Sequence, residues 1–353
     1  MNAPMNHAGV IRQPDLHDPN EVARIEAFVA ELGGNVFQRP LWLQAVERGT
    51  GNLANGLVLE RAGSIEGWLP VSDIHSPLFG RALVSSGFGV GGGALAGASA
   101  DAEALCRAAQ ELALRLSATS IELRGGTAPH DWRRIEGKHA NFTADLAPDD
   151  DAQLLAIPRK ARAEVRKGLA NDLSITIGSS EADRANHYAA YSESVRNLGT
   201  PVFARRLFDA VLDLFGGEAD ILTVRHEGRP VASVLSLYHR GTVMPFWGGG
   251  SHRARALRAN ECMYFELMRH ARRRGCTRFD FGRSKVASGP FAFKKNWGFE
   301  PEPLTYWGWN APGTQPRNID PTDDSFSAKI ALWKTLPLPV ANAIGPWIAR
   351  GLG

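Results

Sequence analysis

The chain has 353 residues, of which 44% are hydrophobic and 22% are charged, and its formal net charge at pH 7 is +3. These values are typical of a soluble globular protein with two or three domains, and they exclude a protein that binds nucleic acid through its overall charge. No apolar segment is long enough to span a membrane, and the first residues do not resemble a secretory signal, so we expect a cytoplasmic protein. The three cysteines, Cys106, Cys262 and Cys276, show no pairing pattern. They are expected to be reduced and packed in the core, with a catalytic thiol as the alternative.

The first half of the chain is predicted to form one α/β unit after a flexible tail of residues 1–19. Apolar residues at helical spacing favour two helices after the tail, and Gly51 directly follows the second of them. Asp101 is the expected N-cap of a third helix. In chain order we expect helices 21–32 and 39–50, two strands within 53–76 joined by a turn at 62–64, a glycine-rich segment at 87–93, helix 101–118 and strand 120–125.

The second half is predicted to repeat this order, with helix 204–215, a strand meander over 221–250, helix 259–275 and strand 277–284. Helix 103–116 and strand 120–124 correspond to helix 261–274 and strand 278–282 at an offset of about 160 residues. One order of elements at one spacing predicts two copies of one α/β unit. The alternative is coincidence between two common helix–strand pairs.

A strongly basic amphipathic segment lies between the two copies. At 100° per residue, Ile157, Ala161, Val165 and Leu169 share one side of a helix. Solvated helix faces usually mix both signs of charge, so the opposite side favours a site for phosphate or another polyanion, with a plain solvated face as the alternative. That side carries five cations with only Glu164 near its border, namely Arg159, Lys160, Arg162, Arg166 and Lys167.

The motifs of several enzyme classes are absent from the sequence. It has no Walker loop, no GxSxG elbow and no two histidines three or four residues apart, so neither a metal site nor a serine hydrolase is expected. A glycine run at 248–250 ends a predicted strand and precedes a helix, which is a typical anion site, with a plain connection and exposed arginines as the alternative. The candidate cofactor-binding residues here are Gly249, Gly250, Arg253, Arg255 and Asn260.

The tandem order of strand, loop, helix and strand resembles the Fem-type peptidyltransferases, which carry two acetyltransferase-like (GNAT) domains. RFDFGRSKVASGPFAFKKNWGF (278–299) resembles their second-domain signature, VFQRPLWLQAV (36–46) their N-terminal helix, and RKARAEVRKGLANDLSI (159–175) the basic helix that ends their first domain. The chain looks closest to the subgroup associated with PEP-CTERM protein sorting and exopolysaccharide loci. The resemblance implies an α/β fold of two GNAT-like domains with mixed central sheets. We expect these domains at residues 20–170 and 171–312, followed by a basic, tryptophan-containing tail at 313–353.

The resemblance implies transfer of an acyl or aminoacyl group to an amine on a cell-envelope, exopolysaccharide or protein-sorting substrate. The donor is expected to be aminoacyl-tRNA or acyl-CoA, without a tightly bound cofactor. The acceptor is a lipid-linked or nucleotide-linked sugar or a protein amine, and no DNA partner is expected. SSGFGVGG (85–92) lacks the acidic residue that family members often have before Gly-Gly, and RARALRAN (253–260) lacks the glycines of a CoA pyrophosphate loop. A CoA-dependent N-acyltransferase and a non-catalytic glycan- or protein-binding protein are the alternatives.

The candidate catalytic residues are Asp280, Lys294 and Tyr264. Asp280 alternates with two phenylalanines and faces the other side of its strand, where it either orients an acceptor amine or pairs with an arginine such as Arg283. The resemblance favours Lys294 over Lys295 as the cation that holds a phosphate or the transition-state oxygen. For Tyr264 the alternative to an acid/base role is core packing, as it is for Trp247. The candidate substrate-binding residues are Arg283, Ser284, Lys285, Trp247, Arg159, Arg162 and Arg166.

The segment that starts at Ser325 contains Lys329, Lys334 and Arg350, two tryptophans and no acidic residue. Segments of this kind can lie on anionic membrane surfaces, so peripheral contact with the inner membrane is one of two expectations. Docking of the segment on its own domain is the alternative.

Overall fold

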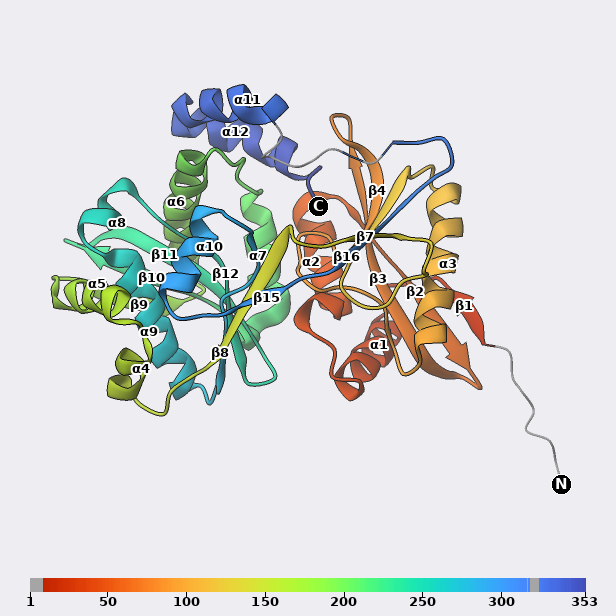
Figure 1. Ribbon diagram of the computed structural model, residues 1–353, viewed down its shortest axis with the longest axis horizontal. Coiled ribbons are helices and arrows are strands. Elements are labelled where there is room, and N and C mark those ends of the chain that lie inside the picture. Colours follow the sequence, from red (N-terminus) through yellow and green to blue (C-terminus); the bar gives the residue numbers. More distant parts are fainter. Residues whose placement is uncertain (1–8, 316, 318–323) are drawn as a thin grey trace. The chain divides into compact units, whose positions relative to one another are not determined.

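The computed structural model describes residues 9–315, 317 and 324–353 (Figure 1). The chain divides into two compact units. The first unit comprises Met1–Glu136, Thr305–Ile319 and Arg350–Gly353, and the second comprises Gly137–Leu304 and Asp320–Ala349. Among the described residues, no helix has the length and apolar character needed to cross a membrane.

The first unit is built on one mixed sheet. Its elements are β1 (Val10–Arg12), α1 (Pro19–Glu31), the 3-10 helix η1 (Val36–Gln38), α2 (Pro40–Thr50), β2 (Leu53–Arg61), β3 (Ser64–Ser76), β4 (Gly80–Ser85), β5 (Leu95–Ala96), α3 (Ser99–Arg115), β6 (Ser120–Arg124), β7 (Arg133–Ile135) and β16 (Tyr306–Asn310). The strand order is β1-β2-β3-β4-β6-β16-β7, with β5 beside β3. Only β4 and β6 run parallel within this described sheet.

Both faces of the first sheet are covered by helices, because its strands are apolar on both sides. Val58 packs in a cluster with residues of α1 and α2. Its neighbours Leu57 and Leu59 point to the opposite face and pack in a cluster with residues of α3. The alternation of a strand thus directs successive side chains into two separate core layers.

The second unit contains another mixed sheet. Its elements are β8 (His139–Asp145), α4 (Asp150–Ala156), α5 (Arg159–Ala170), β9 (Ser174–Gly178), α6 (Glu181–Leu198), α7 (Arg205–Phe215), η2 (Gly216–Glu218), β10 (Ala219–His226), β11 (Arg229–His239), β12 (Thr242–Gly250), α8 (His252–Ala256), α9 (Ala259–Arg273), β13 (Arg278–Asp280), β14 (Ser284–Lys285), α10 (Gly289–Asn296), β15 (Pro301–Pro303), α11 (Asp324–Thr335) and α12 (Leu338–Ala349). The strand order is β14-β8-β13-β12-β11-β10-β9, with β15 beside β8.

The two units repeat one order of elements. In each, a meander of three antiparallel strands is followed by a helix and by a strand parallel to the third strand of the meander. These are β2-β3-β4, α3 and β6 in the first unit, and β10-β11-β12, α9 and β13 in the second. The predicted α/β class with two mixed sheets is therefore confirmed.

The division of the chain differs from the one expected at residue 170. Strand β8 pairs with β13 of the second sheet, and the basic helix α5 packs on α9, so residues 137–170 belong to the second unit. In return, β16 pairs with β6 of the first sheet. Relative to the expected boundary at residue 170, β8 and β16 thus each belong to the other unit, and local sequence patterns do not reveal such an exchange.

Three further expectations need correction. The predicted flexible tail of residues 1–19 contains strand β1, which pairs with β2, and residues 1–8 lie outside the described range. Asp101 is not the N-cap of α3, because the helix begins earlier and Ala98 is the cap. Asp101 instead forms an ion pair with Arg61, with 2.6 Å between Nη2 and Oδ1. In the expected tail 313–353, the described part includes α11 and α12, which pack on α6. Residues 316 and 318–323 lie outside the described range.

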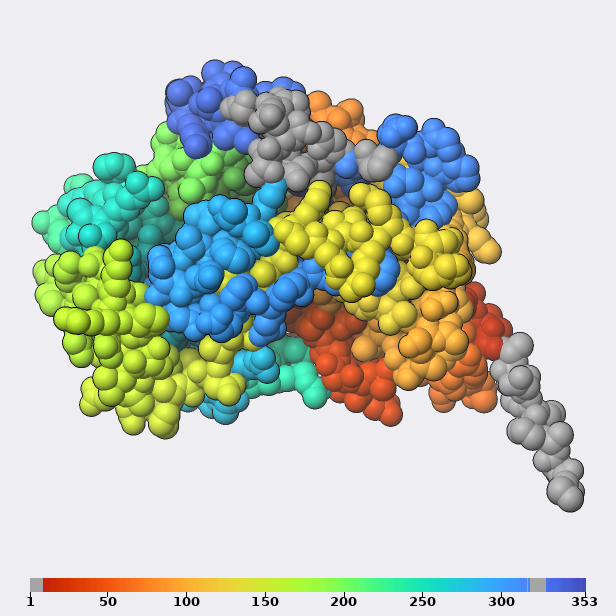
Figure 2. Space-filling view, viewed as in Figure 1, coloured from red at the N-terminus to blue at the C-terminus, as the bar shows by residue number. Residues whose placement is uncertain are grey.

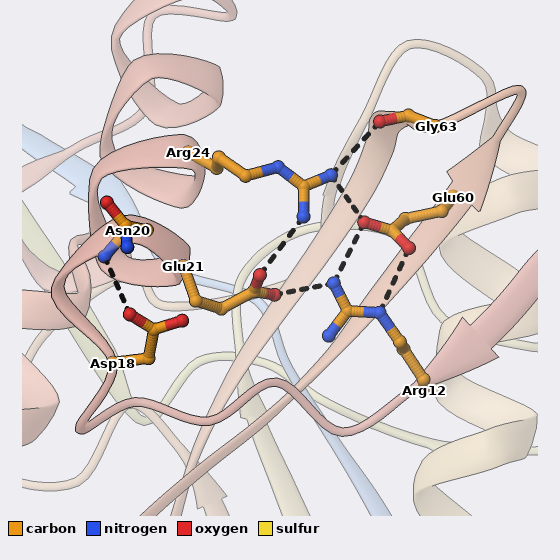
Figure 3. A network of polar contacts seen from close by, with 7 residues as sticks. All are labelled: Arg12, Asp18, Asn20, Glu21, Arg24, Glu60 and Gly63. Carbon is orange, nitrogen blue, oxygen red and sulfur yellow. Dashed lines mark hydrogen bonds and ion pairs between the residues drawn. The ribbon is translucent and has the colours of Figure 1, made fainter.

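A network of alternating charges holds β1 against α1 and β2 in the first unit (Figure 3). Arg12 donates to Glu60 (2.9 Å from Nε to Oε2) and to Glu21 (2.6 Å from Nη2 to Oε1). Arg24 donates to the same two carboxylates, with distances of 3.0 Å to Glu21 and 2.6 Å to Glu60. The Arg12 hydrogen bond is the main reason that the pKa of Glu60 falls to about 2.

Candidate functional site

The central feature of the second unit is the separation of β12 from β13. The two strands pair only at Thr242 with Arg278 and at Val243 with Phe279. From Met244 to Gly250, β12 pairs with β11 on one side, and no described strand pairs with it on the side of β13. Pro245, which has no N–H group, and a register shift against Leu235 and Ser236 mark the point of separation. Beyond this point, the β12 backbone therefore has one edge that no described strand covers, beside the end of β13.

Asp280 ends β13 at this point of separation. Its Oδ1 accepts hydrogen bonds from Asn141 Nδ2 (3.0 Å) and from the Gly282 backbone N–H (2.9 Å). Oδ2 accepts none from the described residues. Burial raises the pKa of the Asp280 carboxyl above its usual value, and the two hydrogen bonds and the charge of Lys294 oppose this rise. A carboxylate held by one oxygen, with the other unengaged and with raised basicity, is suited to accept a proton.

Lys294 lies on α10 next to the turn that follows Asp280. Only 9% of its surface is exposed. Its Nζ donates to the carbonyl oxygens of Gly282 (2.8 Å) and Arg283 (3.2 Å), and it lies 5.4 Å from the ring centroid of Phe142. Burial lowers the pKa of Lys294 to about 7, against the attraction of Asp280. An ammonium group has three N–H donors, so one is available to a ligand oxygen. The neighbouring Lys295 is exposed.

Two buried polar atoms next to this pair lack partners. Asn141 Oδ1 and Ser284 Oγ are both buried without a hydrogen bond in the described part of the chain. β8 pairs with β13 and with β14, which brings Asn141 to Asp280 across 139 residues of sequence. Buried acceptors without partners are rare in folded proteins and mark places where water or a ligand binds. Ser284 was a candidate from the sequence, whereas Asn141 was missed because the position of β8 could not be predicted.

Tyr264 of α9 lies in an aromatic cluster on the core side of this site. Its ring contacts Phe281 edge to face at 4.7 Å and also packs near Phe293 and Trp297. Burial raises the pKa of Tyr264 to about 12, so the phenol remains protonated at neutral pH. Its hydroxyl lies beside Gly248 of β12 and makes no hydrogen bond to a described residue. Tyr264 can therefore donate a hydrogen bond to a ligand along β12, but it cannot act as a base.

The glycine run at the end of β12 permits close helix packing. A Cβ atom at Gly249 would lie 2.5 Å from Cβ of Ser194 on α6. The expected open loop after the run is a short helix, α8, in which Leu257 N–H donates to the Arg253 carbonyl. Asn260, near the start of α9, has a buried Oδ1 without a described partner. Gly249 and Gly250 thus permit close packing, and their binding of an anion stays a prediction from the sequence.

Three other candidate residues near β13 differ in burial. Trp247 is buried and packs against Phe208 (4.8 Å between ring centroids) and Phe203, which is the core alternative. Arg283 and Lys285 are partly exposed at the turn between β13 and β14. Their backbone carbonyls accept hydrogen bonds from Lys294 and from Ser288, so this turn is tied to both ends of α10.

Exposed cations gather on α5 and α8. Val165 of α5 is buried, and Asn171 Nδ2 donates to the Leu257 carbonyl (2.7 Å), which joins α5 to the segment before α9. Glu164 pairs with Lys167 and Arg258, while Arg162 donates to the Leu155 carbonyl. We call the exposed set the α5–α8 basic surface; it comprises Arg159, Lys160, Arg166, Lys167, Arg253 and Arg255.

The described residues offer no acidic, histidine or cysteine cluster of three or more that could hold a metal ion. The thiols are also unsuited to catalysis, since all three cysteines are buried. Burial raises the pKa of Cys106 and of Cys262 to about 12, so these thiols remain protonated at neutral pH.

Comparison with known proteins places this site in context. Residues 158–295 match a family model described as the Acetyltransferase (GNAT) domain, and the match begins next to α5 and ends in α10. The chain has the GNAT fold. It is similar to the crystal structure of FemX, with a TM-score of 0.61 and 15% identity over 80% of this chain and 95% of that chain. No curated protein sequence gave a match.

Two further GNAT-like structures cover most of the chain. One is a tandem GNAT protein from the clavulanic acid biosynthesis pathway, solved without AcCoA (TM-score 0.57, 12% identity, 87% of this chain and 100% of that chain). The other is L-PGS from Bacillus licheniformis (TM-score 0.53, 13% identity, 95% of this chain and 97% of that chain). At these identities the likeness establishes the fold, and the PEP-CTERM subgroup stays a prediction from the sequence.

Proposed function

We propose that the second unit transfers an acyl or aminoacyl group to an amine. The observation that carries this proposal is the separation of β12 and β13 at Asp280, with Lys294 buried on the following helix. A ligand bound along β12 would meet Asp280 Oδ2, which has no described partner, and Lys294, whose pKa is lowered. Amide formation requires a base and an oxyanion-stabilising group of this kind.

The acceptor nitrogen attacks the donor carbonyl carbon, and a C–N bond forms as the bond from that carbon to the leaving oxygen or sulfur breaks. Asp280 Oδ2 takes the proton lost by the amine, and this proton then passes to the leaving oxygen or sulfur, directly or through solvent, which restores the carboxylate. Lys294 stabilises the negative charge on the carbonyl oxygen, and Asn141 fixes the carboxylate of Asp280. Most of the rate enhancement comes from holding the donor and the acceptor together.

Aminoacyl-tRNA is the donor that the site supports best. The α5–α8 basic surface offers exposed cations for the phosphates of an RNA acceptor end. Helix α8 occupies the connection in which acyl-CoA enzymes are expected to have a glycine-rich pyrophosphate loop. Acyl-CoA is the second candidate because the matched family is an acetyltransferase domain. The acceptor we propose, an amine of a cell-envelope, exopolysaccharide or protein-sorting substrate, rests on the sequence resemblance.

Isothermal titration with acetyl-CoA and with bulk aminoacyl-tRNA separates the two donors. We expect binding of the tRNA that weakens as salt is added, and loss of most of that binding in the triple variant R159E/R166E/R255E. Tight binding of acetyl-CoA without any binding of tRNA would contradict the proposed donor, but it would not contradict the proposal that the protein transfers an acyl group.

Transfer itself is tested by following radiolabel from bulk aminoacyl-tRNA, or from acetyl-CoA, into amine-bearing molecules of a bacterial envelope extract. Asp280→Asn should lower the rate by about 100-fold or more, because the amide cannot accept the proton. Glu122→Gln is the matched control, since Glu122 lies at the corresponding strand position of the first unit. Equal loss in both variants, or no loss in Asp280→Asn, would contradict the proposal.

A further inference from the structure

Helices α11 and α12 carry several large apolar side chains on their outer surface. Of the thirteen exposed large hydrophobic residues in the described chain, four lie here, including Val340 (44% exposed), Ile344 (42%) and Trp347 (51%). These three share one face of α12, at positions i, i+4 and i+7. The opposite face is made of small residues and is buried, at Ala341, Gly345 and Ala349. Helix α12 thus turns its small residues to the protein and its large apolar residues to solvent.

The outward orientation of this face is fixed by contacts of α11 and α12 with α6 and the segment after it. Asn342 Nδ2 donates to Ser192 Oγ (3.3 Å), and Arg196 Nη1 donates to the Lys334 carbonyl (3.1 Å). Gly345 lies against Val202. Figure 2 shows the two helices, in dark blue, on the surface. Docking on its own domain, the alternative from the sequence, therefore occurs and still leaves the apolar face of α12 exposed.

The sequence of α11 and α12 and of the residues after them is rich in cations and poor in acids. From Ser325 to Gly353 the sequence has three cations and no acidic residue. The only acid of α11 is its first residue, Asp324, whereas Lys334 lies in its last turn. At the end of α6, the partly exposed Arg196 lies two residues before Leu198, which is 56% exposed. An apolar face bordered by cations and bearing a tryptophan complements the headgroup region of an anionic bilayer.

We propose that the α12 apolar face, formed by Val340, Ile344 and Trp347, docks the protein on an anionic membrane surface. Helix α12 has 12 residues, so it would lie in the interface with its large residues among the upper acyl chains and would not span the bilayer. The cations of α11 and α6 would add electrostatic attraction that is sensitive to salt. This proposal is independent of the proposed transferase activity.

The test is flotation of the whole protein with vesicles of phosphatidylglycerol and phosphatidylcholine, compared with pure phosphatidylcholine vesicles. We expect binding to the anionic vesicles that is at least about tenfold tighter than to the neutral ones and that weakens as salt is added. The variant I344S/W347S should bind at least about tenfold more weakly, since it removes two of the inserted side chains.

Leu155→Ser is the matched control, because Leu155 of α4 is 68% exposed and lies outside the α12 apolar face. It should bind like the wild type, and thermal melting should show that both variants fold. The proposal is overturned if the wild type does not float with anionic vesicles or if I344S/W347S floats equally well. It is also overturned if light scattering shows a lipid-free dimer that only I344S/W347S abolishes, since the face would then join two copies of the chain.

Discussion

The two units share one order of elements, but their central parallel strands pair over different lengths. In the first unit, β4 and β6 pair at four positions, and the Arg124 N–H then donates to Ser85 Oγ. Beyond the strands, the two chain segments stay together, and a Cβ atom at Gly93 would lie 2.2 Å from the Gly125 carbonyl oxygen. In the second unit the corresponding strands pair at two positions and separate. A duplicated fold thus holds one closed and one open version of the same strand pair.

The side chains at the corresponding strand positions also differ between the two units. Aligning the two helix–strand pairs places Glu122 at the position of Asp280 and Arg124 at that of Gly282. Arg124 is buried and donates to Glu122, to the Gly89 carbonyl (2.9 Å) and to the Gly353 carbonyl (2.7 Å). The first unit therefore places its own guanidinium where the second unit has the turn at Gly282 and Lys294. We infer that the first unit is structural and that chemistry belongs to the second.

The largest expected effect follows replacement of the buried cation of the second unit. Lys294→Met should reduce label transfer by about 100-fold or more, because the developing oxyanion loses its charge partner. The melting temperature should stay near that of the wild type. Lys295→Met is the matched control, since the adjacent lysine is exposed. If Lys294→Met unfolds the protein, or if Lys295→Met is equally inactive, the comparison between the units loses its main support.

The pH dependence of transfer should report the same lysine. Lys294 has a pKa of about 7, so it is cationic below that pH and becomes neutral above it. We therefore expect kcat to fall about tenfold per pH unit on the alkaline side of pH 7, provided that the acceptor amine is present in excess. A pH–rate profile from 5.5 to 9 tests this. A rate that rises steadily to pH 9 would show that the charge of Lys294 does not matter.

Removal of the buried cation of the first unit should affect stability and leave activity unchanged. Arg124→Met removes the hydrogen bonds to Glu122 and to three backbone carbonyls, which should cost about 2–4 kcal/mol of unfolding free energy. Urea denaturation measures this cost, and label transfer below the transition should equal that of the wild type. Loss of transfer in a folded Arg124→Met protein would contradict the structural role of the first unit.

A smaller effect should follow substitution in the glycine run. Gly249→Ala places a methyl group against Ser194, which should cost about 1–3 kcal/mol of stability. Gly217→Ala is the control in the same unit, because a methyl group there meets nothing within 4 Å. If both variants are equally stable, close packing against α6 is not the reason for a glycine at position 249.

The smallest effect is expected at the charge network of the first unit. Glu60→Gln should cost about 1–2 kcal/mol at pH 7, because both Arg12 and Arg24 lose an ionic partner. The folded pKa of about 2 is depressed, so this contribution is present above the unfolded pKa and is lost as the pH falls through the folded pKa. Thermal melts of the wild type and variant should therefore converge as the pH falls from about 5 to about 2.

Much of the fold could be predicted from the sequence, because its helices and the strand meander follow local periodicity. The turn at Ala62 and Gly63 and the turn at Glu227 and Gly228 lie where the residue types place them, with positive φ at all four. The exchange of β8 and β16 could not be predicted, because it depends on pairing between distant segments.

The candidate site was only partly predictable for the same reason. Phe279 and Phe281 are buried, as their alternation with Asp280 predicts, and Lys294 lies beside the turn that follows them. The fixing of Asp280 by Asn141 depends on β8, and the packing role of Gly249 depends on α6. Sequence patterns describe the local element, whereas these contacts are set by neighbours from elsewhere in the chain.

The central claim is that ligands bind where β12 and β13 separate and not at the closed strand pair of the first unit. Hydrogen–deuterium exchange of the wild type with and without bulk aminoacyl-tRNA, repeated with acetyl-CoA, tests it most directly. The account predicts that a bound donor protects residues 244–250, 280–285 and the first turn of α9, and leaves residues 82–93 unchanged. Protection confined to residues 82–93 and 120–126 would contradict it.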